Sequence, residues 1–465
     1  MRAIVVALIV ICAYLAGGSI AQPFIDGDLF WQRALGEQIL ATGHIPTVLG
    51  HDVFSAPGVP WLPQEWISSI LVAFAFRANT IWLLAVLTGI TFFATLWISA
   101  VRAKRWNASQ NGVLLALLLG VICLVPGFVL RSQIWVWPLF AALLLSLDYD
   151  DARVWLSLPI VVVWANLHAS AVLAIPIVWL DTGVYALRRI VPQLGVIEGG
   201  ALRTRCILSV AVVIAAMCTP FGWGLLKYAT ETHPSFQYIY EWFPISSLDF
   251  QIVAGFIPLV GLCLYCAWRL WRIHPRDVVL SIALAVYAVM HQRNIGLFTI
   301  SAMPLAAVVI GKGAQWSRWF EGARGTLIAV VICVVAGPVA AWLGYGVSAS
   351  QPPLFTPPQA SIAALRTQPG EHRLLCTTYS WCSTFLGDPS VRVFLDGRAD
   401  PYPDDVWKAF LTIIRVEPGW QDALSHYDVN TVLAKRQGLL AHDLGISSQW
   451  REIPDSDPCC RLFVR

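Results

Sequence analysis

Apolar runs that end at charged residues fill most of the chain up to residue 346. A run of about 20 apolar residues is long enough for a helix to cross a bilayer, and some of these runs are shorter. We therefore predict eleven membrane-spanning helices, at residues 3–20, 81–101, 112–130, 134–147, 154–167, 170–187, 206–219, 251–268, 278–291, 294–311 and 325–346. A further short run at 66–76 predicts a helix lying along the outer membrane face.

Basic residues mark one side of this arrangement. If the N-terminus lies in the cytoplasm, every basic cluster falls in a cytoplasmic turn, as the positive-inside rule requires. These clusters contain Arg102, Lys104, Arg105, Arg153, Arg188, Arg189, Arg203, Arg205, Arg269, Arg272, Arg276, Lys312, Arg318 and Arg324. An odd number of spans then places the C-terminal part outside.

The first 21 residues permit two interpretations. Arg2, the apolar stretch that follows and Ser19-Ile20-Ala21 fit a signal peptide with a small-residue cleavage site. We favour a retained first helix, because the chain goes on to span the membrane repeatedly. Both interpretations place residues 24–66 outside.

The composition changes after residue 346. Gln351-Pro352-Pro353 and Pro357-Pro358 predict a stiff linker at 347–358. Beyond it, β-rich runs alternate with helical stretches, which is typical of a small α/β domain. The runs lie at 373–378, 391–396, 429–434 and 461–464, and the helical stretches at 359–366, 404–415 and 418–427. We expect a transmembrane domain at 1–346, which includes an outer loop at 21–80, and an extracytoplasmic domain at 359–465.

The composition supports a membrane protein. Hydrophobic residues make up 57% of the 465 residues and charged residues 13%, whereas soluble domains carry about 25% charged residues. The expected fold class is a polytopic α-helical membrane protein with a small C-terminal α/β domain. A net charge of +3 gives no reason to expect a nucleic-acid partner. Without a Gly-rich phosphate loop, ATP hydrolysis and redox chemistry are not expected.

The eleven cysteines show no metal-binding spacing. Seven lie in or beside apolar runs, where a thiol acts as a small hydrophobic group. Cys376, Cys382, Cys459 and Cys460 lie in the polar C-terminal part and can form disulfides if that part faces an oxidising compartment. Free buried thiols are an equally open interpretation.

Polar residues from distant parts of the chain share the predicted outer face. The longest polar interval of the first half, Phe24–Trp66, gathers acidic residues and tryptophans between apolar runs. The other polar sets are Arg131 with Gln133, Asn166 with His168, the interval Thr219–Asp249, and His291-Gln292-Arg293. Each set alone can be a helix-end group, but their convergence on one face indicates a pocket.

Two acidic residues, Asp26 and Asp28, are the catalytic candidates. Asp28 precedes a helical pattern, so it can simply cap that helix. Alternatively, a carboxylate at the membrane surface can remove a proton from an acceptor hydroxyl.

The remaining candidates would bind a phosphate or a sugar. Arginine pairs bidentately with phosphate oxygens, which points to Arg131 and Arg293, with His168 and His291 as further donors. The expected substrate-binding residues are Glu65, Trp66, Gln133, Asn166, Glu241 and Trp242. Asp396, Arg398 and Asp400 in the C-terminal part are expected to hold a turn.

The first loop resembles a bacterial family of multi-spanning proteins. The resemblance rests on Asp26-x-Asp28-x-x-Trp31, Gly36, Ile45-Pro46, Asp52-x-Phe54-Ser55, Gly58-x-Pro60-Trp61 and Glu65-Trp66. Similar stretches follow over nearly the whole chain: Asn166-Leu167-His168, Thr219-Pro220-Phe221-Gly222, Glu241-Trp242, Arg293 ahead of Pro304, and Phe394–Tyr402. The family is grouped with GT-C membrane glycosyltransferases of the dolichyl-phosphate-mannose-protein mannosyltransferase and RgtA/B/C/D-like type.

The resemblance implies a GT-C-like fold and an inverting glycosyl transfer. A sugar would move from a polyprenyl-phosphate carrier to a lipid, glycan or protein acceptor on the outer face of the bacterial cytoplasmic membrane. An acidic residue of the first outer loop would serve as the base or help to bind a divalent metal ion, a role that falls on Asp26 or Asp28. Gln32 departs from the family pattern, which has His there, so the resemblance assigns position 32 no direct role.

Two other functions stay open. A transporter or flippase for a lipid-linked or anionic substrate predicts ionisable or broken helices near the bilayer midplane and symmetry between halves. A non-catalytic envelope assembly protein is the other. We favour the glycosyltransferase, because the polar groups gather mainly at one face and no half-to-half repeat is visible.

Overall fold

The computed structural model describes residues 2–21, 27–191, 194, 200–231, 233–312, 356–454 and 457–465. The predicted span 325–346, most of the linker 347–358 and Asp26 lie outside these residues. The chain divides into two compact units. Within the described residues, the first unit holds 2–21, 81–230 and 240–312, and the second holds 27–80, 231–239 and 356–465.

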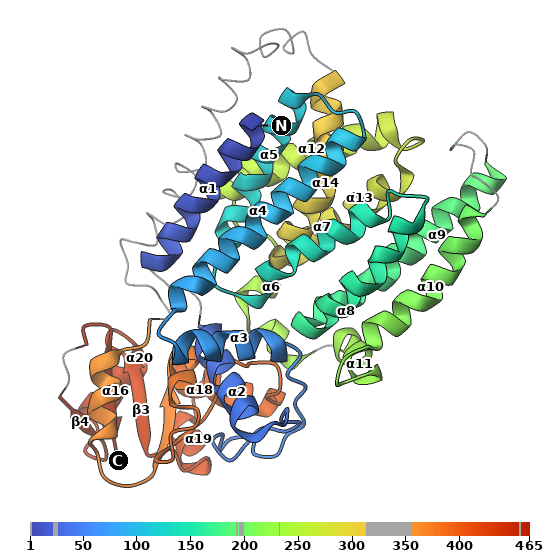
Figure 1. The fold of residues 1–465 in the computed structure, drawn as a ribbon. Helices are drawn as coiled ribbons and strands as arrows, with labels where there is room; N and C mark the ends of the chain where they lie inside the picture. Colours follow the sequence, from blue (N-terminus) through green and yellow to red (C-terminus); the bar gives the residue numbers. More distant parts are fainter. Residues whose placement is uncertain are drawn as a thin grey trace. The chain divides into compact units, whose positions relative to one another are not determined.

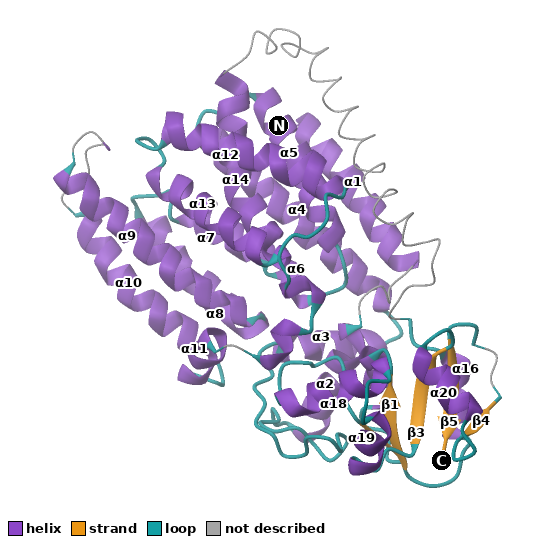
Figure 2. Ribbon diagram, turned by 180° about the vertical axis from the view of Figure 1, so that it is seen from behind, coloured by secondary structure: helices purple, strands orange, loops and turns teal. Residues whose placement is uncertain are grey.

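The first unit is a bundle of helices (Figures 1 and 2). Its helices are α1 (Arg2–Ala21), α4 (Ile81–Arg105), α5 (Gln110–Leu124), α6 (Ser132–Trp135), α7 (Trp137–Ser146), α8 (Ser157–Leu167), α9 (Ala174–Ile190), α10 (Ala201–Met217), α11 (Trp223–Thr230), α12 (Ile257–Leu270), α13 (Pro275–Met290) and α14 (Ile295–Lys312). Each predicted span on described residues coincides with one of these helices or with two consecutive ones.

Five described stretches are long and apolar enough to cross a membrane. They are Ile81–Arg105, Gln110–Gly127, Ala169–Ile190, Ile252–Arg269 and Gln292–Ile310. The apolar helices Ser132–Ser146 and Ala152–Leu167 are shorter. The chain is a multi-pass helical membrane protein, and the count of eleven spans stays a prediction.

Small residues let the helices of this bundle approach closely. A Cβ on Gly120 of α5 would lie within 3.0 Å of the Met303 side chain of α14, and one on Gly89 of α4 would lie 3.2 Å from Ala16 Cβ of α1. Small residues at helix contacts are typical of membrane proteins, where close backbone approach strengthens van der Waals packing.

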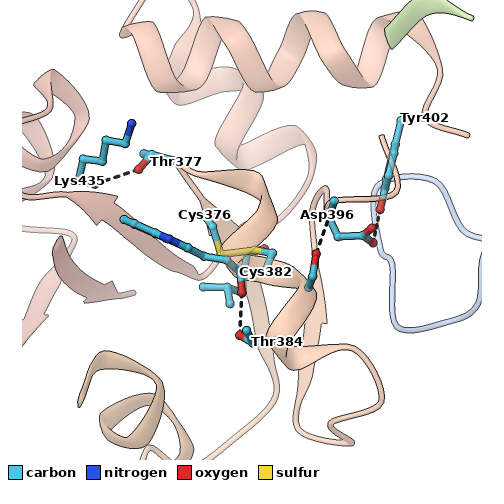
Figure 3. Close-up of a disulfide and its surroundings, with 11 residues drawn as sticks. Cys376, Thr377, Cys382, Thr384, Asp396, Tyr402 and Lys435 are labelled. Carbon is cyan, nitrogen blue, oxygen red and sulfur yellow. Dashed lines mark hydrogen bonds between the residues drawn. A yellow bond between two sulfur atoms is a disulfide. The ribbon is translucent and has the colours of Figure 1, made fainter. Parts of the chain in front are cut away.

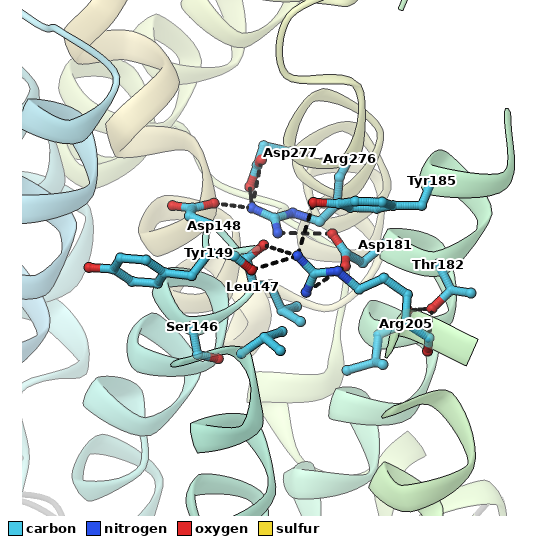
Figure 4. Close-up of polar contacts among 12 residues, drawn as sticks. Ser146, Leu147, Asp148, Tyr149, Asp181, Thr182, Tyr185, Arg205, Arg276 and Asp277 are labelled. Atoms are coloured by element: carbon cyan, nitrogen blue, oxygen red, sulfur yellow. Dashed lines mark hydrogen bonds and ion pairs between the residues drawn. The ribbon is translucent and has the colours of Figure 1, made fainter. Parts of the chain in front are cut away.

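One end of the bundle holds a buried ion-pair cluster (Figure 4). It comprises Arg102, Asp148, Asp181, Arg205, Arg276 and Asp277, all at most 7% exposed. Arg276 is its centre, with Nη1 3.1 Å from Asp181 Oδ1 and Nη2 2.9 Å from Asp277 Oδ2. The three arginines, expected in cytoplasmic turns, are instead buried within helices, which is tolerable because three aspartates balance their charge.

The second unit contains a five-stranded mixed sheet in the order β2-β1-β3-β5-β4. β1 (His372–Cys376) is parallel to β2 (Val391–Val393) and β3 (Thr431–Lys435), whereas β5 (Cys460–Val464) is antiparallel to β3 and β4 (Arg451–Ile453). The C-terminal helices are α16 (Gln359–Arg366), α17 (Tyr379–Cys382), α18 (Asp404–Arg415), α19 (Trp420–His426) and α20 (Leu439–Ile446). In α18 the buried residues Val406, Trp407, Phe410 and Ile413 repeat at helical spacing and face the core.

The first loop is built into this unit. Val393 N of β2 donates to Asp52 O (2.7 Å), and Phe54 N donates to Val393 O (3.1 Å). Residues 233–239 join as well, since Tyr238 stacks on Trp407 with ring centroids 5.2 Å apart. Three distant segments therefore form one compact unit.

Two helices of the loop cross at a glycine. α2 (Asp28–Thr42) packs on α3 (Trp66–Arg77), which coincides with the helix predicted at 66–76. A Cβ on Gly36 of α2 would lie 2.1 Å from Ser69 O and 2.7 Å from Ala73 Cβ of α3. Only a residue without a side chain permits this approach.

A disulfide joins Cys376 and Cys382 in the C-terminal part (Figure 3). The sulfur atoms connect the end of β1 to α17 across a separation of six residues. Cys459 and Cys460, the other two candidates, form no disulfide within the described residues, and their sulfur atoms lie 3.2 Å apart.

Candidate functional site

Arg131 and Glu241 form an ion pair at the end of the bundle to which α8 and α13 lead. Arg131 precedes α6 in an extended conformation, and its Nη1 lies 2.6 Å from Glu241 Oε1. The two side chains are 21% and 40% exposed. Burial disfavours the carboxylate form, but the guanidinium groups of Arg131 and Arg293 hold the pKa of Glu241 below its ordinary value. Glu241 therefore stays ionised at neutral pH.

The backbone around Glu241 is fastened to the connection between α13 and α14. Glu241 lies in the 3-10 turn Tyr240–Trp242. Gln292 Nε2 donates to Tyr240 O (2.7 Å), and Gln292 N donates to Phe243 O (3.1 Å). These bonds hold the chain on both sides of Glu241, while its side chain keeps partial access to solvent.

Arg293 and Trp242 stack beside this ion pair. The Arg293 guanidinium lies over the Trp242 ring, 4.3 Å from its centroid, as a cation–π contact. His291 Nδ1 lies 2.8 Å from Trp242 O, and because a carbonyl oxygen only accepts, Nδ1 carries the proton. Gln133 Nε2 donates to Arg293 O (3.5 Å).

His168 lies in the turn between α8 and the 3-10 turn Ala169–Leu173. Ser170 N donates to His168 Nδ1 (3.0 Å), so the proton of the neutral ring is on Nε2. Burial, and then the positive charges of Arg293 and Arg131, lower the pKa of His168 to about 3. The side chain is thus neutral and adds no positive charge to the site.

The Asn166 side chain connects two helices through hydrogen bonds. Its Nδ2 donates to Val162 O (2.9 Å) within α8 and to Cys218 O (2.8 Å) just after α10. Both amide hydrogens are used in this way, so any contact of Asn166 with a substrate would have to involve Oδ1.

Asp28, the described catalytic candidate, lies in the second unit. It is the first residue of α2, and Gly27 occupies the N-cap position that sequence reasoning considered for an aspartate. Trp31 Nε1 donates to Asp28 Oδ1 (3.1 Å). The half-buried carboxylate lies at the N-terminus of α2.

Glu65 and Trp66 belong to the crossing of α2 and α3. Gln32 Nε2 donates to Glu65 Oε2, and Gln64 Nε2 donates to Glu65 Oε1 (3.3 Å). Glu65 is 7% exposed, and Trp66 Nε1 is buried without a hydrogen-bond partner among the described residues. Their expected contact with substrate stays a prediction.

Sequence reasoning missed the support that the C-terminal part gives to α2. A Cβ on Gly397 would lie 2.8 Å from Trp31 Cδ1 and 3.5 Å from Gly27 O. The turn that carries Gly397 is rigid, because Asp396 accepts from Arg398 Nε (2.9 Å) and Tyr402 OH (2.6 Å). The expected structural role of Asp396 and Arg398 is confirmed, but only the fold reveals the contact with Trp31.

The candidates thus fall into two sets, one in each unit. Arg131, His168, Glu241, Trp242, His291 and Arg293 converge with Gln133 in the first, and Asp28, Glu65 and Trp66 lie in the second. Within the described part of the chain, no group of three or more His, Cys, Asp or Glu side chains is arranged to hold a metal ion.

Comparison with known proteins identifies the fold. No protein-family model and no curated protein matches the chain. ArnT from Cupriavidus metallidurans, solved with undecaprenyl phosphate, is 15% identical with a TM-score of 0.59, over 99% of this chain and 97% of ArnT. The archaeal oligosaccharyltransferase AglB from Archaeoglobus fulgidus, solved with an inhibitory peptide and a dolichol-phosphate, is 10% identical with a TM-score of 0.63, over 92% of this chain and 69% of AglB.

The mycobacterial arabinofuranosyltransferase AftD is also similar. It is 14% identical with a TM-score of 0.56, and the match covers 98% of this chain but 39% of AftD. The three proteins are GT-C glycosyltransferases. The chain therefore has the fold of the GT-C membrane glycosyltransferases.

Proposed function

We propose that the protein is an integral-membrane glycosyltransferase that uses a polyprenyl-phosphate-linked sugar. The observation that carries the proposal is the pair Arg131 and Arg293, two guanidinium groups at one end of the bundle. The protein also shares its fold with ArnT, solved with undecaprenyl phosphate, and with AglB, solved with a dolichol-phosphate. Transfer would take place outside the cytoplasmic membrane, onto a lipid, glycan or protein acceptor.

The transfer exchanges one bond for another at the anomeric carbon. The acceptor oxygen forms a bond to that carbon, and the bond from the carbon to the phosphate oxygen breaks, so its electron pair leaves with the polyprenyl phosphate. Asp28 or Asp26 takes the acceptor proton as general base. Arg131 and Arg293 stabilise the charge that develops on the departing phosphate.

The other candidates would orient the substrate. Trp242 and Trp66 offer ring faces to a sugar, and His291 and Gln133 position Trp242 and Arg293 through the bonds already described. His168 contributes as a neutral donor through Nε2. No step of this transfer is assigned to a divalent ion.

Analysis of cell-envelope glycans tests the proposal. Glycolipids and envelope glycans would be compared by mass spectrometry in cells with the wild-type protein, a deletion, Asp28→Asn or Arg131→Ala. We expect one sugar to be absent from the deletion strain and from both variants. We also expect its polyprenyl-phosphate donor to accumulate. Arg392→Ala, which breaks an exposed ion pair with Glu371 in the second unit, is the control and should leave the glycans unchanged.

Two results would speak against parts of the proposal. Unchanged glycans in the deletion strain would reject a transferase and favour transport or assembly. Full transfer by an Asp26→Asn/Asp28→Asn double variant, with loss in Arg131→Ala, would reject the base assignment alone.

A further inference from the structure

Two adjacent cysteines at the start of β5 take no part in the function proposed above. Cys459 lies in a turn, and Cys460 is the first residue of the strand. Their sulfur atoms are 3.2 Å apart, with the Cys459 thiol donating to Cys460 Sγ. Cys460 is fully buried, whereas Cys459 is partly exposed. Of the two thiols, Cys459 is therefore the one that a reagent from solution reaches first.

Arg436 fixes the turn that brings the two thiols together. Its backbone N–H donates to Cys459 O (2.9 Å). Its guanidinium donates to three further carbonyl oxygens, those of Asp457 (2.7 Å), Pro458 (3.2 Å) and Cys460 (2.8 Å). Successive side chains of an extended strand point to opposite faces. Because the turn keeps Cys459 out of the strand, its sulfur atom can lie beside that of Cys460.

A chain of hydrogen bonds leads from Cys460 to a carboxylate. Ser361 belongs to α16, which packs beside β5 (Figure 2), and its Oγ lies 3.3 Å from Cys460 Sγ. The hydroxyl and the backbone N–H of Ser361 both donate to Asp457 Oδ2, at 2.9 Å and 2.6 Å. Since Ser361 gives its hydroxyl proton to Asp457, its oxygen accepts from the Cys460 thiol. A proton that leaves Cys460 thus has a path through Ser361 to the half-buried Asp457.

We propose that Cys459 and Cys460 form a redox-active site, a vicinal dithiol that an external disulfide oxidises to a disulfide, with Ser361 and Asp457 as the proton path. The inference does not depend on glycosyl transfer. The same part of the chain carries the Cys376–Cys382 disulfide, which agrees with a compartment in which disulfides form.

The exchange takes place in two steps. The Cys459 thiolate attacks one sulfur atom of the external disulfide, whose S–S bond breaks, and the electron pair leaves with the other sulfur atom as a thiolate. Cys460 then gives its proton through Ser361 to Asp457 and attacks Cys459 Sγ, which forms the Cys459–Cys460 bond and releases the second external thiolate. The protons of the two cysteines pass through solvent to the two released thiolates. The protein loses two electrons, and the external disulfide becomes two thiols.

The second step needs the proton path. The hydrogen bond from Cys459, and then burial, raise the pKa of the Cys460 thiol. Cys460 is therefore protonated at neutral pH, and its attack requires a group that takes the proton.

A bond between neighbouring cysteines is easier to reduce than an ordinary structural disulfide. The Cα atoms of disulfide-bonded cysteines are usually about 4.4–6.8 Å apart, and those of Cys376 and Cys382 are 5.8 Å apart. Consecutive Cα atoms are about 3.8 Å apart, so a Cys459–Cys460 bond departs from this geometry. Disulfides that depart from it are more readily reduced. The pair is thus able to change its redox state while Cys376–Cys382 stays oxidised.

Redox titration of the purified full chain in nanodiscs tests the site. Trypsin separates the two pairs, because peptide 452–461 contains Cys459 and Cys460, and peptide 374–392 contains Cys376 and Cys382. The chain is equilibrated with mixtures of reduced and oxidised glutathione, quenched with acid, denatured, alkylated, digested and analysed by mass spectrometry. We expect a disulfide in 452–461 that is half-reduced at a reduced-glutathione concentration at least about tenfold lower than 374–392 requires. Two alkylated thiols in 452–461 in every mixture, or reduction of both peptides at the same concentration, would overturn the proposal.

Cysteine variants test the order of the two thiols and the source of the disulfide. With oxidised glutathione, Cys460→Ser should retain a mixed disulfide on Cys459, and the buried Cys460 of Cys459→Ser should stay unmodified over the same time. The reverse pattern would overturn the order. In acid-quenched cells, a small adduct on 452–461 of Cys460→Ser indicates a small-molecule disulfide, and a protein-sized adduct on a non-reducing gel indicates a protein disulfide. A chain with neither adduct would overturn exchange in the cell.

Ser361→Ala tests the proton path. We expect the mixed disulfide to close at least about tenfold more slowly at pH 7, and the difference to shrink as pH rises, because hydroxide then removes the Cys460 proton. Ser390→Ala is the matched control, since Ser390 also donates its N–H and hydroxyl to one aspartate, Asp388, and it should leave the rate unchanged. An unchanged rate in Ser361→Ala, or a defect that does not depend on pH, would reject the path. Thermal unfolding shows whether each variant is folded.

Discussion

His168 shows how one side chain at the site is kept neutral. Its Nδ1 accepts from Ser170 N and so caps the turn that begins α9, and it is 8% exposed. Protonating Nδ1 would remove this acceptor and bury a positive charge beside Arg131 and Arg293. The neutral ring is therefore part of the folded structure, independent of any contact with substrate.

This neutrality predicts a dependence of stability on pH. The pKa of His168 is about 3 when folded and 6.5 ordinarily, so between these values the unfolded chain binds more protons, and stability falls as pH falls below 6.5. At pH 5.0 the loss is on the order of 2 kcal/mol. In His168→Asn the amide oxygen can replace Nδ1 as cap acceptor without titrating. The decrease in Tm between pH 7.5 and 5.0 should be smaller in this variant than in the wild type.

The matched control is His44→Asn, because His44 is an exposed histidine of the second unit. It should lose as much Tm as the wild type over the same pH range. If His168→Asn also shows the full decrease, His168 is not the group whose protonation destabilises the fold.

At the scale of elements, Gly36 decides how closely α2 and α3 pack. The backbone of Ser69 occupies the place of a Cβ at position 36, so one helix must shift to admit a methyl group. The same contact holds Glu65 against Gln32 and thereby connects the packing to the candidate residues of the loop. Asp28 at the start of α2 depends on this crossing for its position.

Gly36→Ala should therefore destabilise the protein by about 1–3 kcal/mol, the usual cost of overpacking. Gly183→Ala is the control, because Gly183 lies within α9 and a Cβ there meets nothing within 4 Å. Alanine at an open helical position is ordinarily favourable by about 1 kcal/mol. Thermal unfolding in detergent compares the two variants, and an equal or higher Tm for Gly36→Ala than for Gly183→Ala would contradict the steric explanation.

The elements that were predicted well from the sequence are those marked by a pattern of neighbouring residues. Apolar runs gave the helices of the first unit, and β-rich runs gave β1, β2, β3 and β5 within a few residues. β4 was missed because it has three residues, of which only Ile453 is buried. The loop's pairing with β2 was also missed, since Val53 and Val393 are far apart in sequence and no local pattern joins them.

The same limit applies to the candidate site. The outer-face pattern grouped Arg131, Glu241 and Arg293, and the structure brings these three side chains together although 110 residues separate Arg131 from Glu241. The pattern did not show that Glu241 pairs with Arg131. It also did not show that Asn166 donates its amide hydrogens to two backbone carbonyls. Partner choice depends on side-chain geometry, which follows only from the packed helices.

At the scale of the whole molecule, the disulfide bears on the orientation of the chain. Disulfides persist in oxidising compartments and are rare in the cytosol. The Cys376–Cys382 bond therefore agrees with an extracytoplasmic C-terminal part, which the positive-inside pattern predicts independently. A cytoplasmic N-terminus and an odd number of spans would account for both.

Thiol labelling tests this orientation at the two ends of one helix. Cys206 lies near the start of α10 and Cys218 just after its end, and both are exposed free thiols. In spheroplasts, a membrane-impermeant maleimide should label Cys218, which the predicted topology places at the outer end of a span, and should reach Cys206, at the inner end, only after the membrane is disrupted. Cys376 and Cys382 should resist alkylation until a reductant is added. Labelling of Cys206 but not Cys218 in intact spheroplasts, or reduced Cys376 and Cys382 in freshly quenched cells, would reverse the orientation and place the candidate donor site on the cytoplasmic face.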